Sequence, residues 1–151
     1  MYHSIVKWRV RTLFEAINRG DAEPVLRSFS SRFEHWFLGD NHALGGSRHT
    51  LGTTRAWYDR LYRLLPDLKF EVFRVWVSGG PWSTLVVAEW RETNSGTDGV
   101  RTSNRGVHVM HLRWGRVTQL TICPDTIELK STLDRLARSG NSEAHATPIV
   151  D

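Results

Sequence analysis

The chain has 151 residues, of which 40% are hydrophobic, including seven Trp and six Phe. This length fits one domain and this composition can fill a core, which excludes a disordered chain. No apolar run approaches the roughly 20 residues that cross a bilayer, and no secretion signal is recognisable, so we expect a cytoplasmic protein with no membrane partner. A single cysteine, Cys123, excludes an internal disulfide and a cysteine-based zinc site.

The formal net charge is +4, which raises the question of a nucleic-acid partner. The arginines are spread singly along the chain, with no run of four or more. Glycine-rich, zinc and helix-turn-helix signatures are all lacking. We therefore expect no nucleic-acid partner.

The first part of the chain is predicted to form a helical hairpin followed by a strand. Apolar residues at helical spacing predict an amphipathic helix over residues 4–19. Asp21 can cap a second helix. Pro24 would lie in the first turn of that helix, where proline is tolerated. Residues 33–38, FEHWFL, are aromatic and too short for another helix, and they predict a strand that is followed by a loop.

A third helix and a β-hairpin follow. Thr53 can cap the helix, which ends at Pro66. Residues 68–78 and 82–93 are rich in Val, Phe and Trp and flank a Gly-Gly-Pro turn, so they are predicted to pair. Alternation along the first of these strands places one apolar pair on one face and three apolar residues on the other. The pair is Phe70 and Val72, and the three are Phe73, Val75 and Val77.

The last part of the chain begins with a second hairpin over residues 105–125, which reverses at residues 114–116. Asp125 stands three residues before Glu128 and can cap a helix over residues 126–138. Residues 139–151 show no periodicity and are expected to form a frayed, disordered tail. A single domain is therefore expected over residues 1–138.

This order of elements predicts the α+β class, with three to four helices on one face of a curved, mostly antiparallel sheet. Such a sheet bends into a cone, and cones commonly hold a ligand pocket.

Three segments carry a family resemblance: FEAINRGDAEPVLRSF, TLGTTRAWYDRLYRLLPDLKFEV and GVHVMHLRWGRVTQLTICPDTIELKSTLDRL. They resemble the SnoaL-like group of the NTF2-like superfamily, which includes relatives of ketosteroid isomerase, limonene epoxide hydrolase and the small polyketide cyclases. The resemblance implies a cone-shaped NTF2-like fold with a buried pocket, and often a homodimer, here through the sheet face. It implies fold more firmly than function, because the same cone hosts isomerases, hydrolases, cyclases and members without known activity.

Two residues are candidate catalytic groups. His108 lies where the ketosteroid isomerase pattern has its proton-donating acid, so it could act as an acid or base near neutral pH or donate to a forming enolate. The alternative is a histidine that is satisfied by a helix carbonyl or by a dimer interface. Asp125 matches the acid/base carboxylate of the cyclase pattern, yet a capping role explains this residue by itself.

His111 lies three residues beyond His108 and therefore faces the other side of the strand. A metal site of the His-x-x-His type is then disfavoured, and we expect no metal.

The expected pocket wall is aromatic. On the first strand, either Glu34 and Trp36 or His35 and Phe37 face the pocket, and the resemblance favours Glu34 and Trp36. Glu89 and Arg91 share the solvated face of a later strand, which places Trp90 on the pocket side. Tyr58 and Met110 complete the expected wall.

These assignments predict cofactor-independent acid/base chemistry on a small hydrophobic carbonyl compound, such as an aldol-type cyclisation or an isomerisation. In that reading Asp125, or a water that it holds, removes a proton and His108 stabilises the oxyanion. The alternative is a module that shelters a hydrophobic ligand without converting it.

Overall fold

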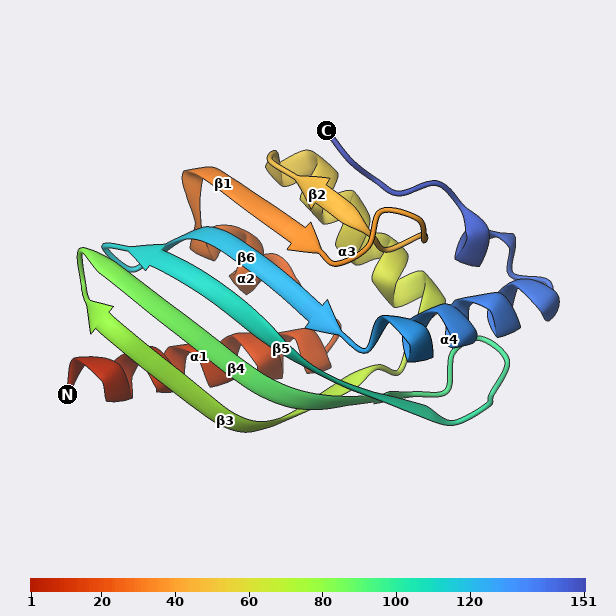
Figure 1. Cartoon of the computed structure of the whole chain (residues 1–151), viewed down its shortest axis with the longest axis horizontal. Coiled ribbons are helices and arrows are strands. Elements are labelled where there is room, and N and C mark those ends of the chain that lie inside the picture. Colours follow the sequence, from red (N-terminus) through yellow and green to blue (C-terminus); the bar gives the residue numbers. More distant parts are fainter.

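The computed structural model describes residues 1–151 and contains one six-stranded sheet in the order β2-β1-β6-β5-β4-β3. Figure 1 shows α1 running along β3 and β4, α3 beside β1 and β2, and α4 at the opposite end from the N-terminus. The elements are α1 (Tyr2–Asn18), α2 (Glu23–Ser28), β1 (Phe29–Phe37), β2 (Gly46–Arg48), α3 (Leu51–Leu64), β3 (Lys69–Gly80), β4 (Ser83–Asn94), β5 (Thr102–Arg113), β6 (Arg116–Pro124), α4 (Thr126–Arg138) and a short 3₁₀ helix, Ser142–His145.

The sheet is mostly antiparallel, as expected. Strands β3, β4, β5 and β6 pair in sequence order as antiparallel neighbours, while β1 runs parallel to β6 and antiparallel to β2. A single cluster of 30 buried hydrophobic residues fills the space between the sheet and the helices. The α+β class is therefore confirmed. None of the helices is long and apolar enough to cross a membrane.

Side-chain caps mark the starts of α3 and α4, whereas α2 begins after Ala22 and the predicted cap residue, Asp21, lies one position before it. The Asp125 carboxylate accepts hydrogen bonds from the backbone N–H groups of Ile127 and Glu128, at 3.1 and 3.2 Å, which confirms the predicted cap of α4. Helix α3 begins one turn earlier than predicted, because Thr50 rather than Thr53 is its N-cap and accepts from the Thr53 N–H. Both residues can cap a helix, so the sequence alone does not decide between them.

A β-bulge changes the faces of β3. The register with β4 shifts between Val72 and Arg74, so that Phe73 is the extra residue. Because one inserted residue reverses the alternation, Val75 and Val77 lie on the same face as Val72, and the predicted division of this strand into two faces is wrong beyond the bulge.

Residues 139–151 differ from the expected frayed tail. They form the 3₁₀ helix and then return along β2 and the start of α3 (Figure 1). The Ile149 carbonyl accepts from Arg48 Nη1 at 2.7 Å, and the Asp151 carboxylate accepts from the Thr50 hydroxyl at 2.7 Å. Polar groups of the domain make these contacts. The tail therefore needs no periodic apolar residues, and its sequence gives no sign that it is ordered.

Candidate functional site

A cavity of about 70 Å³ lies between the inner face of the sheet and the helices, and 20 of its 25 lining residues are hydrophobic. This space holds several water molecules, or a slim planar molecule once they leave. The polar side chains in the lining are therefore few, and they decide its chemistry. These side chains are His108, Glu92, Asn104, Tyr58 and Ser28, together with the indole N–H of Trp90.

His108 lines the cavity from the inner face of β5, as predicted. The indole N–H of Trp90 donates to His108 Nδ1 at 2.8 Å. Since Nδ1 accepts this bond, the proton of the neutral ring lies on Nε2. Burial lowers the pKa of His108 to about 3. The ring is therefore neutral at ordinary pH and serves as a hydrogen-bond donor, so the second of the two predicted roles, donation to an oxyanion, fits this environment.

Aromatic rings hold His108 in place. The ring centroids of Phe14, Phe70 and Trp90 lie 4.8, 5.9 and 5.7 Å from that of His108. Trp90 can reach across to His108 because its partner on β5 is Gly106. A Cβ atom at this position would lie 2.8 Å from Trp90 Cη2 and 2.4 Å from the Cys123 carbonyl oxygen. The missing side chain of Gly106 thus makes room for the Trp90 indole.

Glu92 is the carboxylic acid of the cavity, and it was not among the predicted site residues. It is buried on β4, two residues beyond Trp90 and on the same face, and its Oε1 accepts from Asn94 Nδ2 at 2.8 Å. Burial raises the pKa of Glu92 to about 7, although the Asn94 hydrogen bond opposes the shift. The alternation that places Trp90 inward also places Glu92 inward, so the signal was present in the sequence.

Asp125 does not line the cavity. Its side chain is exposed and caps α4, while Asn104 fixes its backbone through two hydrogen bonds, from Asn104 Nδ2 to the Asp125 carbonyl at 3.0 Å and from the Asp125 N–H to Asn104 Oδ1 at 2.9 Å. The structure therefore does not bring His108 and Asp125 into one pocket. The capping explanation accounts for Asp125 by itself.

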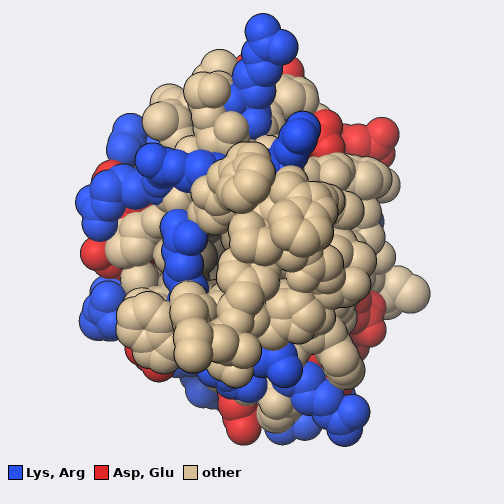
Figure 2. All heavy atoms as spheres, turned by 90° about the vertical axis from the view of Figure 1, so that its left-hand side faces the viewer, with Lys and Arg blue, Asp and Glu red and all other residues tan.

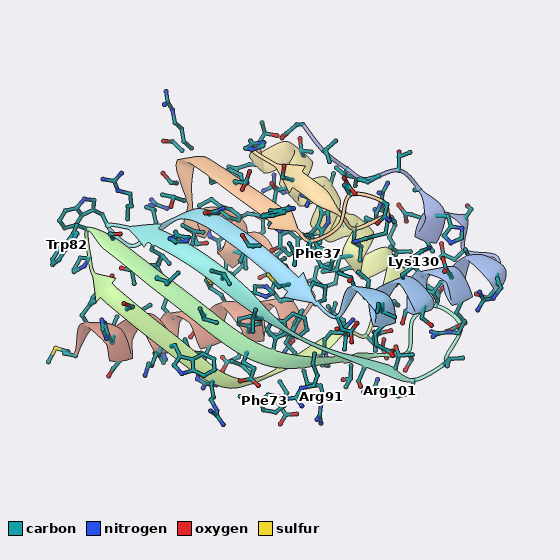
Figure 3. All side chains as sticks on the ribbon, viewed as in Figure 1. Phe37, Phe73, Trp82, Arg91, Arg101 and Lys130 are labelled. Atoms are coloured by element: carbon teal, nitrogen blue, oxygen red, sulfur yellow. The ribbon has the colours of Figure 1, made fainter.

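The first strand presents the other pair of residues to the interior. Phe37 lines the cavity from the end of β1 (Figure 3), and His35 is fully buried, whereas Trp36 is 39% exposed. Glu34 lies on the outer face, where it accepts from Gln119 Nε2 at 3.2 Å. The resemblance thus favoured the wrong pair.

His35 forms a buried polar pair with Arg48. Arg48 Nε donates to His35 Nδ1 at 3.1 Å, which places the proton of the neutral ring on Nε2, and this atom has no hydrogen-bond partner. Burial lowers the pKa of His35 well below its usual value, and the Arg48 charge adds to the shift. The ring lies 4.6 and 5.4 Å from the rings of Trp57 and Tyr58, which line the cavity. It supports the cavity wall from behind.

The remaining predicted wall residues lie at the cavity. Tyr58, Trp90 and Met110 all line it. Burial raises the pKa of Tyr58, so its hydroxyl stays protonated and can donate a hydrogen bond. Glu89 and Arg91 lie on the outer face as expected, and Glu89 forms a cross-strand salt bridge with Arg105 of β5 at 3.4 Å. No group of three or more His, Cys, Asp or Glu side chains is arranged to hold a metal ion.

Comparisons with known proteins agree with this architecture. The family model described as a SnoaL-like domain matches residues 10–120. No curated protein matches the chain. Among solved structures, an NTF2-like protein of unknown function from Burkholderia pseudomallei superposes with a TM-score of 0.71 at 21% identity, covering 83% of this chain and 95% of that one.

Two further structures have the same fold. PrhC from Penicillium brasilianum superposes with a TM-score of 0.78 at 13% identity and covers 95% of both chains. A candidate SnoaL-like polyketide cyclase from Jannaschia sp. CCS1 has a TM-score of 0.68 at 16% identity, over 87% of this chain and 92% of that one. At these identities the structures show the fold alone. The expected NTF2-like fold is confirmed.

Proposed function

The chain belongs to the SnoaL-like domain family, and on that premise we propose that it binds a slim, hydrophobic carbonyl compound and rearranges it by proton transfer without a cofactor. The observation that carries the proposal is the hydrogen bond from Trp90 to His108, which fixes a neutral imidazole with an Nε2–H donor in an apolar cavity. A carbonyl oxygen that accepts this donor is polarised most strongly as it gains negative charge, because little water competes there.

Glu92 supplies the base in this proposal. Its pKa of about 7 makes it a good proton acceptor near neutral pH, and it lies on the same cavity wall as His108. In an isomerisation, Glu92 takes a proton from one carbon and returns it to another. In an aldol-type cyclisation, the resulting enolate carbon attacks a second carbonyl group, and the proton held by Glu92 passes to the new alkoxide.

The spacing of the two groups restricts the substrate. Glu92 faces Asn104 in the β4–β5 ladder and His108 faces Ala88, so the two residues are four positions apart. Four positions correspond to roughly 13 Å along a strand. The side chains of Glu92 and His108 shorten this distance. The substrate proton that Glu92 removes must still lie several bonds from the carbonyl oxygen that His108 polarises. A conjugated ring system or a chain with a second carbonyl group meets this requirement.

A two-ring β,γ-unsaturated ketone tests the proposal, because movement of its double bond into conjugation changes ultraviolet absorbance. We expect turnover that rises with pH through about 7, where the Glu92 carboxyl loses its proton. Glu92→Gln should lower the rate by about 100-fold with little effect on binding, the usual size of a lost general base. Asp125→Asn is the matched control, and it should leave the rate unchanged because Asp125 lies outside the cavity.

A second candidate function is ligand binding without chemistry. The narrow cavity and the three aromatic rings packed around His108 favour it. Quenching of tryptophan fluorescence by the same ketone, with no change in its absorbance, would support this candidate against the enzyme. A ketone series that neither binds nor reacts would count against both.

A further inference from the structure

Three tryptophans are exposed together at one end of the molecule. Trp8 on α1, Trp82 in the β3–β4 turn and Trp114 in the β5–β6 turn are 67%, 62% and 72% exposed. Figure 3 shows Trp82 at the tip of its hairpin, at the end of the molecule opposite α4. Large aromatic side chains are rarely this accessible, and a group of them indicates a binding surface.

Hydrogen bonds join the three elements that carry these tryptophans. The Trp114 N–H donates to the Pro81 carbonyl at 2.6 Å, which connects the two hairpin turns. Arg9 Nη1 donates to the Gly115 carbonyl at 2.8 Å, and this bond connects α1 to the β5–β6 turn. The side chains therefore project from one fixed platform rather than from independent loops.

The backbone at Trp114 is itself unusual. Its φ of 50° lies in the left-handed region, which costs a residue with a side chain about 1 kcal/mol relative to glycine. A turn that served only to reverse the chain would favour Gly or Asn at this position. The presence of tryptophan points to a role for the exposed ring.

The surroundings of the three rings are basic and lack acids. Residues 1–14, 75–88 and 105–124 contain no Asp or Glu. Their exposed basic side chains include Lys7, Arg9, Arg113 and Arg116. Figure 2 views this end and shows uncharged residues at its centre, with blue Lys and Arg side chains around them and the red acidic side chains toward its edge. We call the surface formed by Trp8, Trp82 and Trp114 with these four basic residues the tryptophan end.

We propose that the tryptophan end docks on an anionic lipid surface. Indole rings prefer the boundary between headgroups and acyl chains, and basic side chains beside them bind anionic headgroups. The absence of a membrane-spanning segment, on which the expectation of no membrane partner rested, does not bear on surface binding. A second copy of this chain is a poor partner for this end, because its basic residues would face each other.

A second cavity lies behind the tryptophan end. It has a volume of about 70 Å³ and is lined by Ile5 and Arg9 of α1 and by Gly115 of the β5–β6 turn. Five residues line both this cavity and the main one: Val10, Leu13, Ser28, Met110 and Val117. In a docked molecule these shared side chains would stand between the bilayer side and the cavity of His108, a consequence that rests on the proposed function.

Co-flotation with lipid vesicles tests the docking surface without any substrate, so its outcome is separate from that of the proposed function. We expect the full chain to float with phosphatidylcholine vesicles that contain roughly one third phosphatidylglycerol, and not with phosphatidylcholine alone. Lys7→Gln with Arg113→Gln should weaken binding about 30-fold, since each basic residue near an anionic surface contributes about fivefold. Trp82→Ser with Trp114→Ser should also release the protein.

Two control variants carry the same changes elsewhere. Arg91→Gln with Arg138→Gln removes the same charge, and Arg91 lies far from the tip of the β3–β4 hairpin (Figure 3). Trp36→Ser with Trp76→Ser removes two exposed tryptophans from the outer sheet face. Both controls should bind vesicles like the unmodified protein, and thermal unfolding confirms that each variant folds.

The proposal is overturned if the unmodified protein fails to float with the anionic vesicles. It is also overturned if the controls lose binding as fully as the tryptophan-end variants. Salt-sensitive binding of a single-stranded oligonucleotide in place of vesicles would assign the surface to nucleic acid. Self-association that the tryptophan-end variants abolish, again without vesicle binding, would assign it to a second copy.

Discussion

Glu92 carries an electrostatic cost that a single substitution can remove. Its pKa is about 7 in the folded protein, against 4.5 for a solvated glutamate. Between these values the folded protein holds a proton that the unfolded chain has lost, so stability falls as the pH rises from 4.5 to 7. Above that window the buried carboxylate is charged, and the full penalty applies.

Glu92→Gln should therefore stabilise the protein at alkaline pH only. Glutamine is neutral at every pH and can still accept from Asn94. We expect a gain of about 2 to 3 kcal/mol in unfolding free energy at pH 8 and little change at pH 4. Urea unfolding at both pH values measures it. An equal gain at pH 4 would show that packing rather than charge is responsible.

Trp90→Phe should release the His108 ring from its fixed tautomer. The indole N–H is the only donor to His108 Nδ1, and phenylalanine keeps the ring but lacks this group. In the unmodified protein, ¹⁵N NMR should show a neutral ring protonated at Nε2 that does not titrate above pH 5, because the pKa lies near 3. The variant should show a mixture of tautomers. If the unmodified protein already shows such a mixture, the donor role of His108 is lost.

The family resemblance indicated part of this site. His108 stood out because it matches the position of the proton-donating acid in the ketosteroid isomerase pattern, and the structure places it at the cavity. Glu92 was passed over because acids on strands are usually solvated, and its burial depends on the helices that cover β4. The Trp90–His108 bond depends on the pairing of β4 with β5, and pairing register cannot be read from either strand separately.

At the scale of elements, periodicity predicted the helices and the two hairpins because one face of each is buried and the other is solvated. It failed where the chain departs from regular geometry. The bulge at Phe73 reverses the alternation of β3 without any Gly or Pro to mark it. The start of α3 was misplaced because two threonines can cap it and only the three-dimensional surroundings select Thr50.

Gly106 is the position where the β5–β6 pair and the site depend on each other. A methyl group there would contact the Cys123 carbonyl oxygen, which belongs to the paired strand and cannot move without the hairpin. We expect Gly106→Ala to destabilise the protein by about 2 kcal/mol. Gly52→Ala is the matched control. No heavy atom lies within 4 Å of a Cβ there, and alanine in helix α3 should add about 0.5 to 1 kcal/mol.

Thermal unfolding of the two glycine variants measures both effects. Equal midpoints for Gly106→Ala and the unmodified protein would mean that the hairpin adjusts freely, and the close approach of Trp90 to His108 would then need no glycine.

At the scale of the whole molecule, the outer face of the sheet bears exposed apolar side chains. Trp36, Trp76 and Leu85 are 39%, 48% and 38% exposed on this face. A homodimer through the sheet face remains a prediction, which these side chains favour. Trp76→Glu should shift a dimer toward monomer in sedimentation velocity. A monomer at micromolar concentration in the unmodified protein would contradict the prediction.

The C-terminal residues complete the fold around a buried charge. Arg48 is fully buried, and its guanidinium donates to the carbonyl groups of Gly45, Gly46 and Ile149 while its Nε donates to His35. Burial lowers the pKa of Arg48 to about 10, so it remains charged at neutral pH. A buried cation without a carboxylate partner depends on every carbonyl that it reaches.

Removal of residues 148–151 should therefore cost more than the loss of a frayed tail. The deletion takes the Ile149 carbonyl from Arg48 and takes the Asp151 carboxylate from the N-terminus of α3, where it accepts from the His49 and Thr50 N–H groups at 2.7 and 3.1 Å. Hydrogen bonds to charged groups are worth about 1.5 to 3 kcal/mol, and water that enters offsets part of the loss, so we expect a net destabilisation of about 2 kcal/mol. This corresponds to a melting temperature lower by roughly 5 °C for a domain of this size.

Asp151→Ala should show the smaller part of the effect, because it removes the contact with the N-terminus of α3 and keeps Ile149. If the shortened chain melts within about 1 °C of the full chain, residues 148–151 contribute nothing to the fold, as the expectation of a disordered tail requires.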